Sequence, residues 1–398
     1  MQNILTDPSK SKPRALNAIL AGYRVPTVSR SVVELLITVA GFVVFWVLMV
    51  AALQVHYALV LLLAIPTACF MMRLFMIQHD CGHGALFPGR RANDWVGRSL
   101  GVVTLTPYGL WLRTHAAHHA NAGNLDHRGM GDITTLTTEE YAALGPFHRA
   151  LYRLYRSPIV MFGVIPTYLF VFHYRLPFGL MKAGRQPWLS TMGTNAAIVI
   201  VVGGLMAVMG VGPFLLVEGP VIFVSATLAV WFFYVQHQFE DTLWTHDDEW
   251  SFHEAALNGS SHYDLPPVLA WFTGNIGVHH VHHLASRIPF YRLPEVLRDH
   301  PTPGRRQPPD LPAEPALRNP GPLGREGPKA RLVQGPPARR HALTASRFVD
   351  GWRRRALPTF SLSAPRLRLP RRAPATSAGS GRASCPWSPA EGTKRRRS

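Results

Sequence analysis

The sequence predicts an all-α integral membrane protein with four transmembrane helices, a cytosolic helical cap that carries three histidine clusters, and a disordered C-terminal tail. Three observations support this fold class. Four apolar runs are long enough to cross a bilayer, and they come in two close pairs. Lys and Arg residues flank the pairs but are missing from the short links within them. The three histidine clusters all lie in segments that these charges place on one side of the membrane.

The four apolar runs are the candidate membrane spans. They cover residues 32–53, 58–77, 196–217 and 219–235. A bilayer core needs roughly 20 mostly apolar residues per helix, so each run is long enough or nearly so. A polar break around Gln54 and His56 separates the first pair, and Gly212-Pro213 and Glu218-Gly-Pro220 break the second. Buried core helices of a large soluble protein are the alternative, but two closely paired runs of this length are rare in soluble domains.

Two further segments are moderately apolar. Residues 158–172 contain Pro166 and are followed by His173 and Arg175, which favours a segment that dips into the membrane or lies on its surface. Residues 95–112 contain several glycines and a proline, and we interpret them as an interfacial or re-entrant segment. Such a segment would carry the second histidine cluster back toward the first.

Basic residues give the predicted orientation. Those that precede the first run or border the second are Lys10, Lys12, Arg14, Arg24, Arg30 and Arg73. Many arginines follow in residues 78–195, whereas the two short links have no Lys or Arg. By the positive-inside rule, both termini and the long middle segment lie in the cytosol. We therefore expect an integral membrane protein whose histidine clusters all lie on the cytosolic side.

The formal net charge of +18 does not indicate nucleic-acid binding. Residues 1–300 carry 20 Lys+Arg and 18 Asp+Glu, whereas residues 301–398 carry 21 and 5. This tail also holds 17 of the 34 prolines and shows no sustained apolar period, so we predict that it is disordered. We expect three regions: a cytosolic N-terminal segment (1–30), a membrane domain (31–300) and the basic tail (301–398).

The histidine clusters are the main functional signal. They read His79-Asp-Cys-Gly-His83, His115-Ala-Ala-His118-His119 and His279-His-Val-His282-His283. In a helix, positions i, i+3 and i+4 share one face, so the imidazoles of each cluster can point the same way. Histidine is the commonest side-chain metal ligand near neutral pH. Eight imidazoles in three short stretches are enough for two metal ions.

The donor set is almost entirely imidazole nitrogen. Cys81 is the one thiol within the clusters, which argues against an iron–sulfur cluster, and the H-E-x-x-H pattern of zinc proteases is missing. Imidazole suits Zn, Cu, Fe and Ni alike, so the residues by themselves leave the metal open. Eight or nine ligands over two metals leave coordination positions for an exogenous oxygen species.

The clusters resemble the H-x-x-x-H, H-x-x-H-H and H-x-x-H-H boxes of the integral-membrane fatty acid desaturases. The resemblance runs from about residue 30 to about residue 300. Further motifs resemble the bacterial acyl-lipid branch of the omega-6 or delta-12 type: Gly131-Asp-Ile-Thr134, Tyr234-Val-Gln-His-Gln-Phe-Glu240, and the stretch Asn275 to Pro289 around the third cluster. Regioselectivity depends on pocket depth, which no box encodes.

This resemblance implies a centre of two non-haem Fe ions held by histidines. It also implies O2-dependent formation of a cis double bond in the acyl chain of a membrane lipid, with electrons from a ferredoxin or a cytochrome. A further histidine at the cytosolic end of the fourth span fits the family pattern, either as a ninth ligand or behind the ligands. The ligands expected from the resemblance are His79, His83, His115, His118, His119, His237, His279, His282 and His283.

Other residues near the boxes have two interpretations. Asp80, Asp132, Glu240 and Asp241 would orient imidazoles, as carboxylates commonly do around metals, although Asp132 and Asp241 also fit helix caps or solvated loop charges. The aromatic stretch 231–234 would line an acyl tunnel or serve as core and interfacial anchors. The remaining scattered histidines lack spacing partners, and we interpret them as surface or hydrogen-bonding residues: His127, His148, His173, His246, His253 and His262.

The sequence leaves two rivals to desaturation. Another histidine-box oxygenase, such as a lipid hydroxylase, an alkane hydroxylase or a carotenoid ketolase, would use the same kind of metal centre. A membrane metal carrier is a rival from another class. A carrier should place its ligands near the bilayer midplane, whereas these histidines lie at the ends of the predicted spans. Desaturation is therefore the predicted function.

Overall fold

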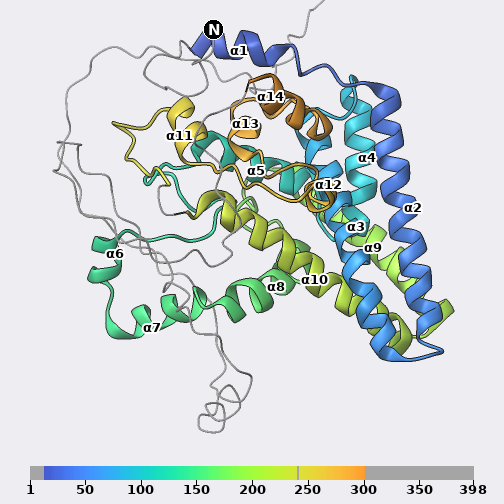
Figure 1. Ribbon diagram of the computed structural model, residues 1–398. Helices are drawn as coiled ribbons and strands as arrows, with labels where there is room; N and C mark the ends of the chain where they lie inside the picture. The colour runs from blue at the N-terminus through green and yellow to red at the C-terminus, as the bar shows by residue number, and fades with distance from the viewer. Residues whose placement is uncertain (1–12, 240–241, 301–398) are drawn as a thin grey trace, which may run out of the picture. The chain divides into compact units, whose positions relative to one another are not determined.

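A first helical hairpin carries the first histidine cluster. The computed structural model describes residues 13–239 and 242–300. Helix α2 (Val28–Ala52) packs along α3 (Tyr57–His83), and a turn at residues 53–56 joins them (Figure 1). His56 caps α3, because its Nδ1 accepts a hydrogen bond from the backbone N–H of Ala58 at 3.1 Å. The predicted break between the first two spans is confirmed.

The second hairpin turns earlier than the sequence predicts. Helices α9 (Arg185–Met209) and α10 (Val211–His237) meet at Gly210, whose φ of 87° lies in the region that favours glycine. The predicted breaks at Gly212-Pro213 and Glu218-Gly-Pro220 are both wrong, because these residues lie inside α10, although the first of them comes only two residues after Gly210. Proline within a transmembrane helix is tolerated where neighbouring groups satisfy the freed backbone. Gly210 rather than Pro220 therefore sets the boundary.

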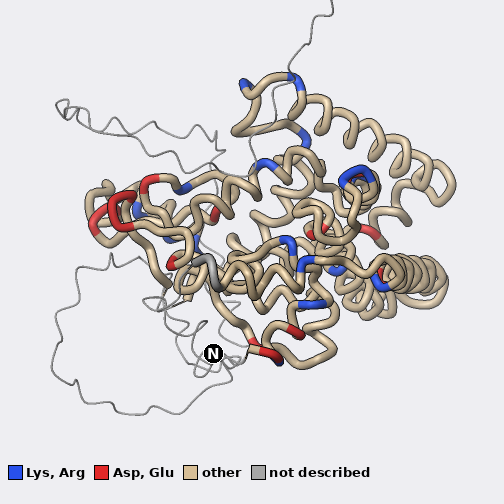
Figure 2. Tube along the Cα trace, turned by 90° about the horizontal axis from the view of Figure 1, so that it is seen from above, with Lys and Arg blue, Asp and Glu red and all other residues tan. Residues whose placement is uncertain are grey.

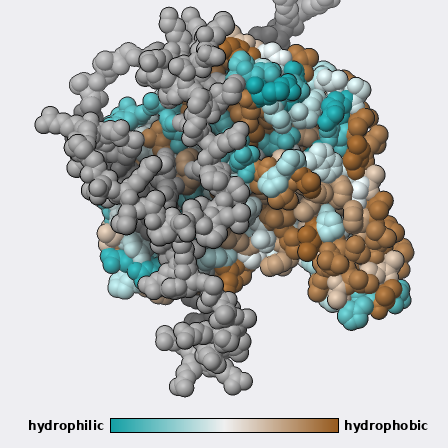
Figure 3. Space-filling model, in the orientation of Figure 1, coloured by the Kyte–Doolittle hydropathy of each residue, from teal (hydrophilic) through white to brown (hydrophobic). Residues whose placement is uncertain are grey.

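The four long helices are apolar enough to cross a membrane. They are α2, α3, α9 and α10, and each has 25 or 27 residues. Many of their apolar side chains are exposed, such as Val208 with 87% of its surface accessible, which is expected for a lipid-facing position. Figure 3 shows a broad hydrophobic surface over this part of the molecule. In Figure 2 the charged residues lie mostly on short helices and loops. The prediction of an all-helical integral membrane protein is confirmed.

The apolar segment 158–172 belongs to a bent pair of helices. Helix α7 (Pro146–Tyr155) is followed by a π-helical turn (Val160–Val164), α8 (Ile165–Val171) and a short 3-10 turn (His173–Arg175). The two arms meet at 57°, the geometry of a broken span or a re-entrant segment. Helix α6 (Thr138–Ala143) precedes them and begins with a capping box between Thr137 and Glu140.

The segment 95–112 folds as two helices that meet at a tight turn. Helices α4 (Arg90–Val103) and α5 (Tyr108–Asn121) approach closely because Gly97 and Gly101 have no side chain. A Cβ at Gly97 would lie 2.3 Å from the Tyr108 ring, and one at Gly101 would lie 2.5 Å from the Thr106 carbonyl oxygen. Gln78 holds this turn against α3 by donating to the Thr106 carbonyl at 3.2 Å. The turn thereby brings α5 to the end of α3.

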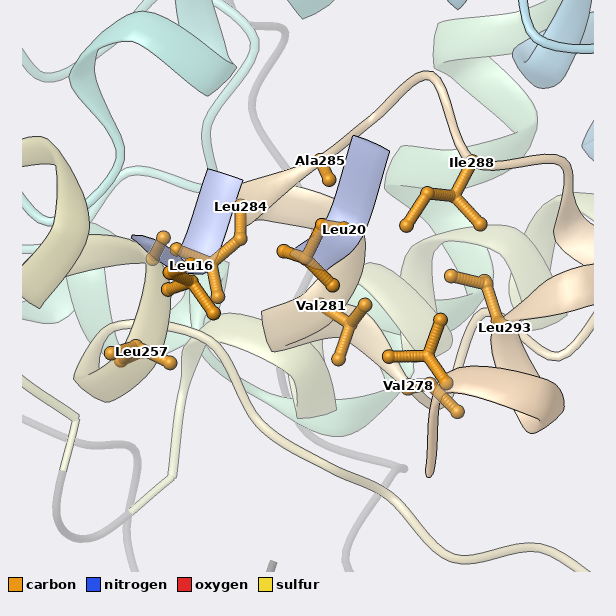
Figure 4. Close-up of a cluster of buried hydrophobic side chains, with 11 residues drawn as sticks. Leu16, Leu20, Leu257, Val278, Val281, Leu284, Ala285, Ile288 and Leu293 are labelled. Atoms are coloured by element: carbon orange, nitrogen blue, oxygen red, sulfur yellow. The ribbon is translucent and has the colours of Figure 1, made fainter. Parts of the chain in front are cut away.

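Short helices from both ends of the described chain complete the cap. They are α1 (Pro13–Ala21), α11 (Phe252–Asn258), α12 (Pro267–Phe272), α13 (His279–Leu284), a 3-10 turn (Phe290–Arg292) and α14 (Leu293–Asp299). Leu16 and Leu20 of α1 pack against Val281 and Leu284 of α13 in a buried cluster that also includes Ile288 (Figure 4). Apolar packing thus holds the outer face of α13. The predicted tail and its disorder lie outside the described residues.

Candidate metal centre

The first cluster lies on the last turn of α3. His79 and His83 are four residues apart, so both project from the same face of the helix. The helix ends directly after them at Gly84, which takes a left-handed conformation with φ 65°. Both imidazoles are buried. The helix end therefore fixes these two rings at the boundary between the long helices and the cap.

The three imidazoles of the second cluster lie in two different places. On α5, Nε2 of His115 lies 3.1 Å from Nε2 of His83 in the first cluster. His119 follows one helical turn later, with its Nε2 3.1 Å from that of His115. His118 instead lies beside His237 at the end of α10, with 3.1 Å between their Nε2 atoms. The histidines of α5 thus contribute to two different groups.

The third cluster lies on α13, a helix of only six residues. Its apolar residues pack outward against α1, so His279, His282 and His283 turn inward and are buried. Nε2 of His282 lies 3.1 Å from that of His119. Nε2 of His279 lies 2.9 Å from that of His237 and 3.1 Å from that of His283. Residues distant in sequence therefore converge.

Together the nine predicted histidines form two groups that could each hold a metal ion. Within each group the candidate ligand nitrogens all lie within 4.8 Å of one another. The five-histidine group is His79, His83, His115, His119 and His282. The four-histidine group is His118, His237, His279 and His283. The structure thus brings all nine predicted residues together.

Hydrogen bonds alone do not explain this arrangement. A neutral imidazole nitrogen either donates a proton or accepts through a lone pair. In the row His83–His115–His119–His282, each neighbouring Nε2 pair is 3.1 Å apart. If the four Nε2 atoms alternated along the row as donors and acceptors, one of the two inner nitrogens would have to accept two protons with a single lone pair. The other inner nitrogen would have to share its single proton between two lone pairs. A cation that takes every lone pair satisfies all four rings.

The spacing fits metal coordination as well. Nitrogens bonded at about 2.1 Å to one ion and separated by a right angle lie about 3.0 Å apart. The nearest Nε2–Nε2 distances, 2.9 to 3.1 Å, agree with this value. The partners of Nδ1 favour the tautomer that carries its proton on Nδ1. Nδ1 of His118 lies 2.5 Å from Asp132 Oδ1, and Nδ1 of His237 lies 3.1 Å from the Gly259 carbonyl oxygen. With the proton on Nδ1, Nε2 is free to bind.

Burial keeps the rings of the cap uncharged. Desolvation, followed by the other imidazoles nearby, holds the pKa of His115 and His119 on α5 well below the usual value. The same causes lower the pKa of His279, His282 and His283 on α13. Neutral imidazole is the form that binds a metal ion. The site is therefore prepared to receive metal ions at neutral pH.

Two of the predicted carboxylates contact imidazoles. Asp132 contacts His118, as described above. Asp80 is buried, with Oδ1 3.3 Å from Nδ1 of His79, and its Oδ2 accepts a hydrogen bond from the Phe290 backbone N–H at 2.6 Å. The other two predicted carboxylates, Glu240 and Asp241, lie outside the described residues.

A cavity of about 690 Å³ reaches both histidine groups. Its wall includes His79 and His115 from the five-histidine group and His279 from the four-histidine group. Apolar residues of α3, α5, α8 and α10 line much of the remainder, and the volume is in the usual range of about 300–1,000 Å³ for ligand sites. Of the aromatic stretch 231–234, Phe232 and Phe233 line the cavity. The cavity is therefore positioned to hold an apolar molecule against the histidines.

The cavity also includes residues that were not predicted to belong to the site, among them His173, which was predicted to be a surface or hydrogen-bonding residue. His173 lines it and stacks on Phe178, with 4.8 Å between ring centroids, although His173 has no spacing partner in the sequence. Arg128 lies at a more polar part of the wall and is paired with Glu140. By contrast His127 and His246 pair with acidic residues at the surface, as predicted for scattered histidines.

Comparison with known proteins agrees with this site. The fatty acid desaturase family model matches residues 55–309. A fatty acid desaturase of Bacillus subtilis (strain 168) is 42% identical over 297 residues, which is 75% of this chain and 84% of that protein. Two enzymes of Synechocystis are also similar. Its sn-1 oleoyl-lipid 12-desaturase is 27% identical over 55% of this chain and 62% of its own length. Its sn-1 acyl-lipid omega-3 desaturase (ferredoxin) is 28% identical over 55% and 61%.

The chain itself has four helices long and apolar enough to cross a membrane and two histidine groups that could each hold a metal ion. The match covers more than half of the chain and includes all three histidine clusters. The chain belongs to the fatty acid desaturase family.

Proposed function

We propose that the nine histidines hold two iron ions, one in each group, and that the protein desaturates acyl chains of membrane lipids with O2. The convergence of Nε2 atoms and the Nδ1 partners of His118 and His237 support a metal site of this size. Membership of the desaturase family favours iron, which is one of the metals that imidazole ligands suit. Asp132 and the Gly259 carbonyl would hold the rings in the binding tautomer.

Two bound iron ions would supply O2 activation for removal of hydrogen from two adjacent methylenes. The acyl chain loses two hydrogen atoms and gains a cis double bond. O2 is reduced to two water molecules by those two hydrogens, two electrons from a carrier and two protons from solvent. The carrier is a ferredoxin or a cytochrome in this proposal. The ferredoxin named for one Synechocystis relative supports the first choice.

The cavity is the observation that carries this function. Its wall contains histidines of both groups, so a methylene held there lies beside both proposed ions. A bound acyl chain would be surrounded by apolar atoms, including those of Met72 and Phe75 of α3 and Phe233 of α10. Such a lining binds an acyl chain through burial of apolar surface and excludes water from the reaction. A water-filled polar channel, which a metal carrier would need, does not match this lining.

The proposal also covers location and regiochemistry. Positive charges around the long helices favour the cytosolic face of a bacterial inner membrane for the histidine groups. The sequence motifs, together with the name of the Synechocystis sn-1 oleoyl-lipid 12-desaturase, support the delta-12 (omega-6) position.

Expression in a host that makes oleate but no dienes tests the function. Gas chromatography with mass spectrometry of the lipids should show a new cis diene that is lost in a His118→Ala variant. Hydroxylated or ketolated lipids without new double bonds would assign the protein to another class of histidine-box oxygenase. An unchanged lipid profile with altered metal uptake would support a carrier. A double bond at another carbon would correct the delta-12 position alone.

A further inference from the structure

An arginine is buried beside the candidate metal centre. Arg73 lies on α3, six residues before His79, and only 1% of its surface is exposed. A buried guanidinium is costly unless it is paired and its hydrogen bonds are satisfied. The metal site as described makes no use of this side chain. Its contacts therefore require a separate explanation.

Arg73 joins three segments of the chain. Its guanidinium forms an ion pair with Glu34 of α2, which is itself buried. Its Nε donates to the Thr38 hydroxyl of α2 at 3.2 Å. On the other side it donates to the backbone carbonyl of Trp271 at the end of α12, and it lies 3.8 Å from the centroid of the Trp271 ring. Glu34 and Thr38 thus aim the guanidinium at α12.

A second polar contact lies two turns further along α3. Asp80 is seven residues after Arg73, so both side chains project from nearly the same face, about 10 Å apart along the axis. Asp80 accepts the backbone N–H of Phe290 at 2.6 Å. Residues 271 and 290 enclose the third histidine cluster in the sequence. Helix α3, which carries the first cluster, therefore holds both ends of the segment that carries the third.

The segment between these contacts follows a tight path along α3. Gly274 and Asn275 have positive φ angles of 58° and 53°, and a Cβ at Gly274 would lie 3.0 Å from Cβ of Met76. Asn275 donates its side-chain N–H to the Phe290 carbonyl at 3.2 Å. The two ends of the segment are therefore tied to each other as well as to α3.

We propose that Arg73, aimed by Glu34, and Asp80 are positioning residues that set the distance between the first and third histidine clusters. Buried ion pairs contribute little net stability compared with apolar residues of similar size. A directional donor to one backbone carbonyl does, however, specify where that carbonyl lies. This inference rests on the proposed function, because the position matters only if these clusters share metal ions.

A double variant separates positioning from stability. Glu34→Leu combined with Arg73→Met removes both charges, leaves no unpaired charge in the bilayer and deletes the donor to Trp271. We expect a folded protein in which iron content falls and kcat drops by about tenfold at unchanged KM. In iron-free protein, amide hydrogen exchange over residues 271–284 should become faster. Wild-type iron content, kcat and exchange in the folded double variant would overturn the inference.

Arg73→Lys provides the second test if the double variant does not fold. A lysine keeps the charge opposite Glu34, but its single ammonium group cannot replace the planar fork that reaches Glu34, Thr38 and Trp271 together. Faster exchange and lower iron content are again expected, and no change in either would refute the inference. Arg30→Gln is the control, because Arg30 pairs with Oε1 of Glu34 at 2.7 Å, whereas Arg73 pairs with Oε2, and Arg30 is 58% exposed. If wild-type protein itself binds no iron and forms no double bond, the proposed function fails instead.

Discussion

Nδ1 of His118 lies 2.5 Å from Oδ1 of Asp132, a short contact between a buried imidazole and a largely buried carboxylate. His118 lies on α5, and Asp132 lies within the loop that follows this helix. Gly131, with φ 82°, allows the loop to pass His118, since a Cβ there would lie 2.8 Å from the Thr114 carbonyl oxygen. The carboxylate thereby keeps the imidazole proton on Nδ1 and leaves Nε2 directed at the other three histidines of its group.

Substituting Asp132 should weaken the four-histidine group. In an Asp132→Asn variant the side-chain amide no longer supplies the negative charge that favours a proton on His118 Nδ1. We expect desaturation and iron affinity to fall by about 10- to 100-fold, the usual cost of losing such a partner. Iron content by mass spectrometry and lipid analysis would measure this. Asp247→Asn is the matched control, because Asp247 pairs with exposed His127 at the surface; an equal loss in both variants would contradict the assignment.

Alanine variants of the two groups should differ in iron content. His83 belongs to the group of five histidines and His283 to the group of four. Removing one ligand from four leaves a poorer site than removing one from five, so purified His283→Ala should retain about one iron ion per chain and His83→Ala more than that. Both should lose desaturation. The control is His148→Ala, an exposed histidine. Equal iron content in all three variants would argue against two separate sites.

Helical spacing predicted eight of the histidines and the family resemblance added His237, but neither predicted their division into two groups. The i, i+3, i+4 rule places His115, His118 and His119 on one face of α5, and the structure confirms that all three point into the centre. It cannot show that His118 joins His237 while its neighbours join the first cluster. That division depends on where α10 and α13 pack against α5, and contacts of this kind are tertiary. The same limit hid the role of Arg73, which in sequence is simply a charge near the edge of a span.

The sequence contains two candidate turn positions at the second hairpin. Both Gly210 and Gly219-Pro220 are turn signals in the sequence. In a soluble helix an internal proline would cost several kcal/mol, roughly 3 or more, and would favour a break there. In a membrane the chain has no water to satisfy an open backbone, so the helix continues through Pro220. The lipid environment, rather than the presence of proline, therefore determines where α10 begins.

The charge of Glu140 should stabilise the fold only above acidic pH. Hydrogen bonds from Arg128, at 2.9 and 2.5 Å, hold the pKa of Glu140 below its usual range. The pKa of Glu140 is lower in the folded state than in the unfolded state. The charge therefore contributes fully to the free energy of unfolding above the unfolded-state pKa of about 4.5, and this contribution is lost as the pH falls through the folded-state pKa. The pair is partly exposed, so its contribution is under about 1 kcal/mol.

Glu140→Gln isolates that charge, because glutamine preserves the capping box with Thr137. Thermal unfolding should show the variant slightly less stable than wild type at neutral pH and equal to it well below pH 4.5, a limit set by the unfolded glutamate. Glu249→Gln removes an exposed glutamate charge elsewhere on the surface and should behave as wild type throughout. A stability difference that grows as the pH falls would mean that the Arg128–Glu140 pair has another role.

Filling the inner end of the cavity should block the acyl chain without disturbing the metal site. Ala229 lines both the main cavity and a smaller one beyond it, where Ile222, Ser225 and Ala226 continue the same face of α10 at helical spacing. From Gln236 at the histidine end to Ile222, this face extends for about 21 Å along the helix. It is therefore the part of the wall along which the far end of a bound chain would lie.

In an Ala229→Phe variant the added ring occupies this space, so the chain can no longer place its reacting carbons beside the histidines. We expect desaturation of long acyl chains to fall by on the order of 100-fold, the cost of a misplacement of about 1 Å, while iron content stays at the wild-type value. Val208→Phe makes a similar change at a lipid-facing position, 87% exposed, and should leave both unchanged. Full activity in Ala229→Phe would show that the chain binds elsewhere. Loss of iron in that variant would mean instead that α10 had shifted, because Ala229 lies eight residues from His237 and contributes no ligand.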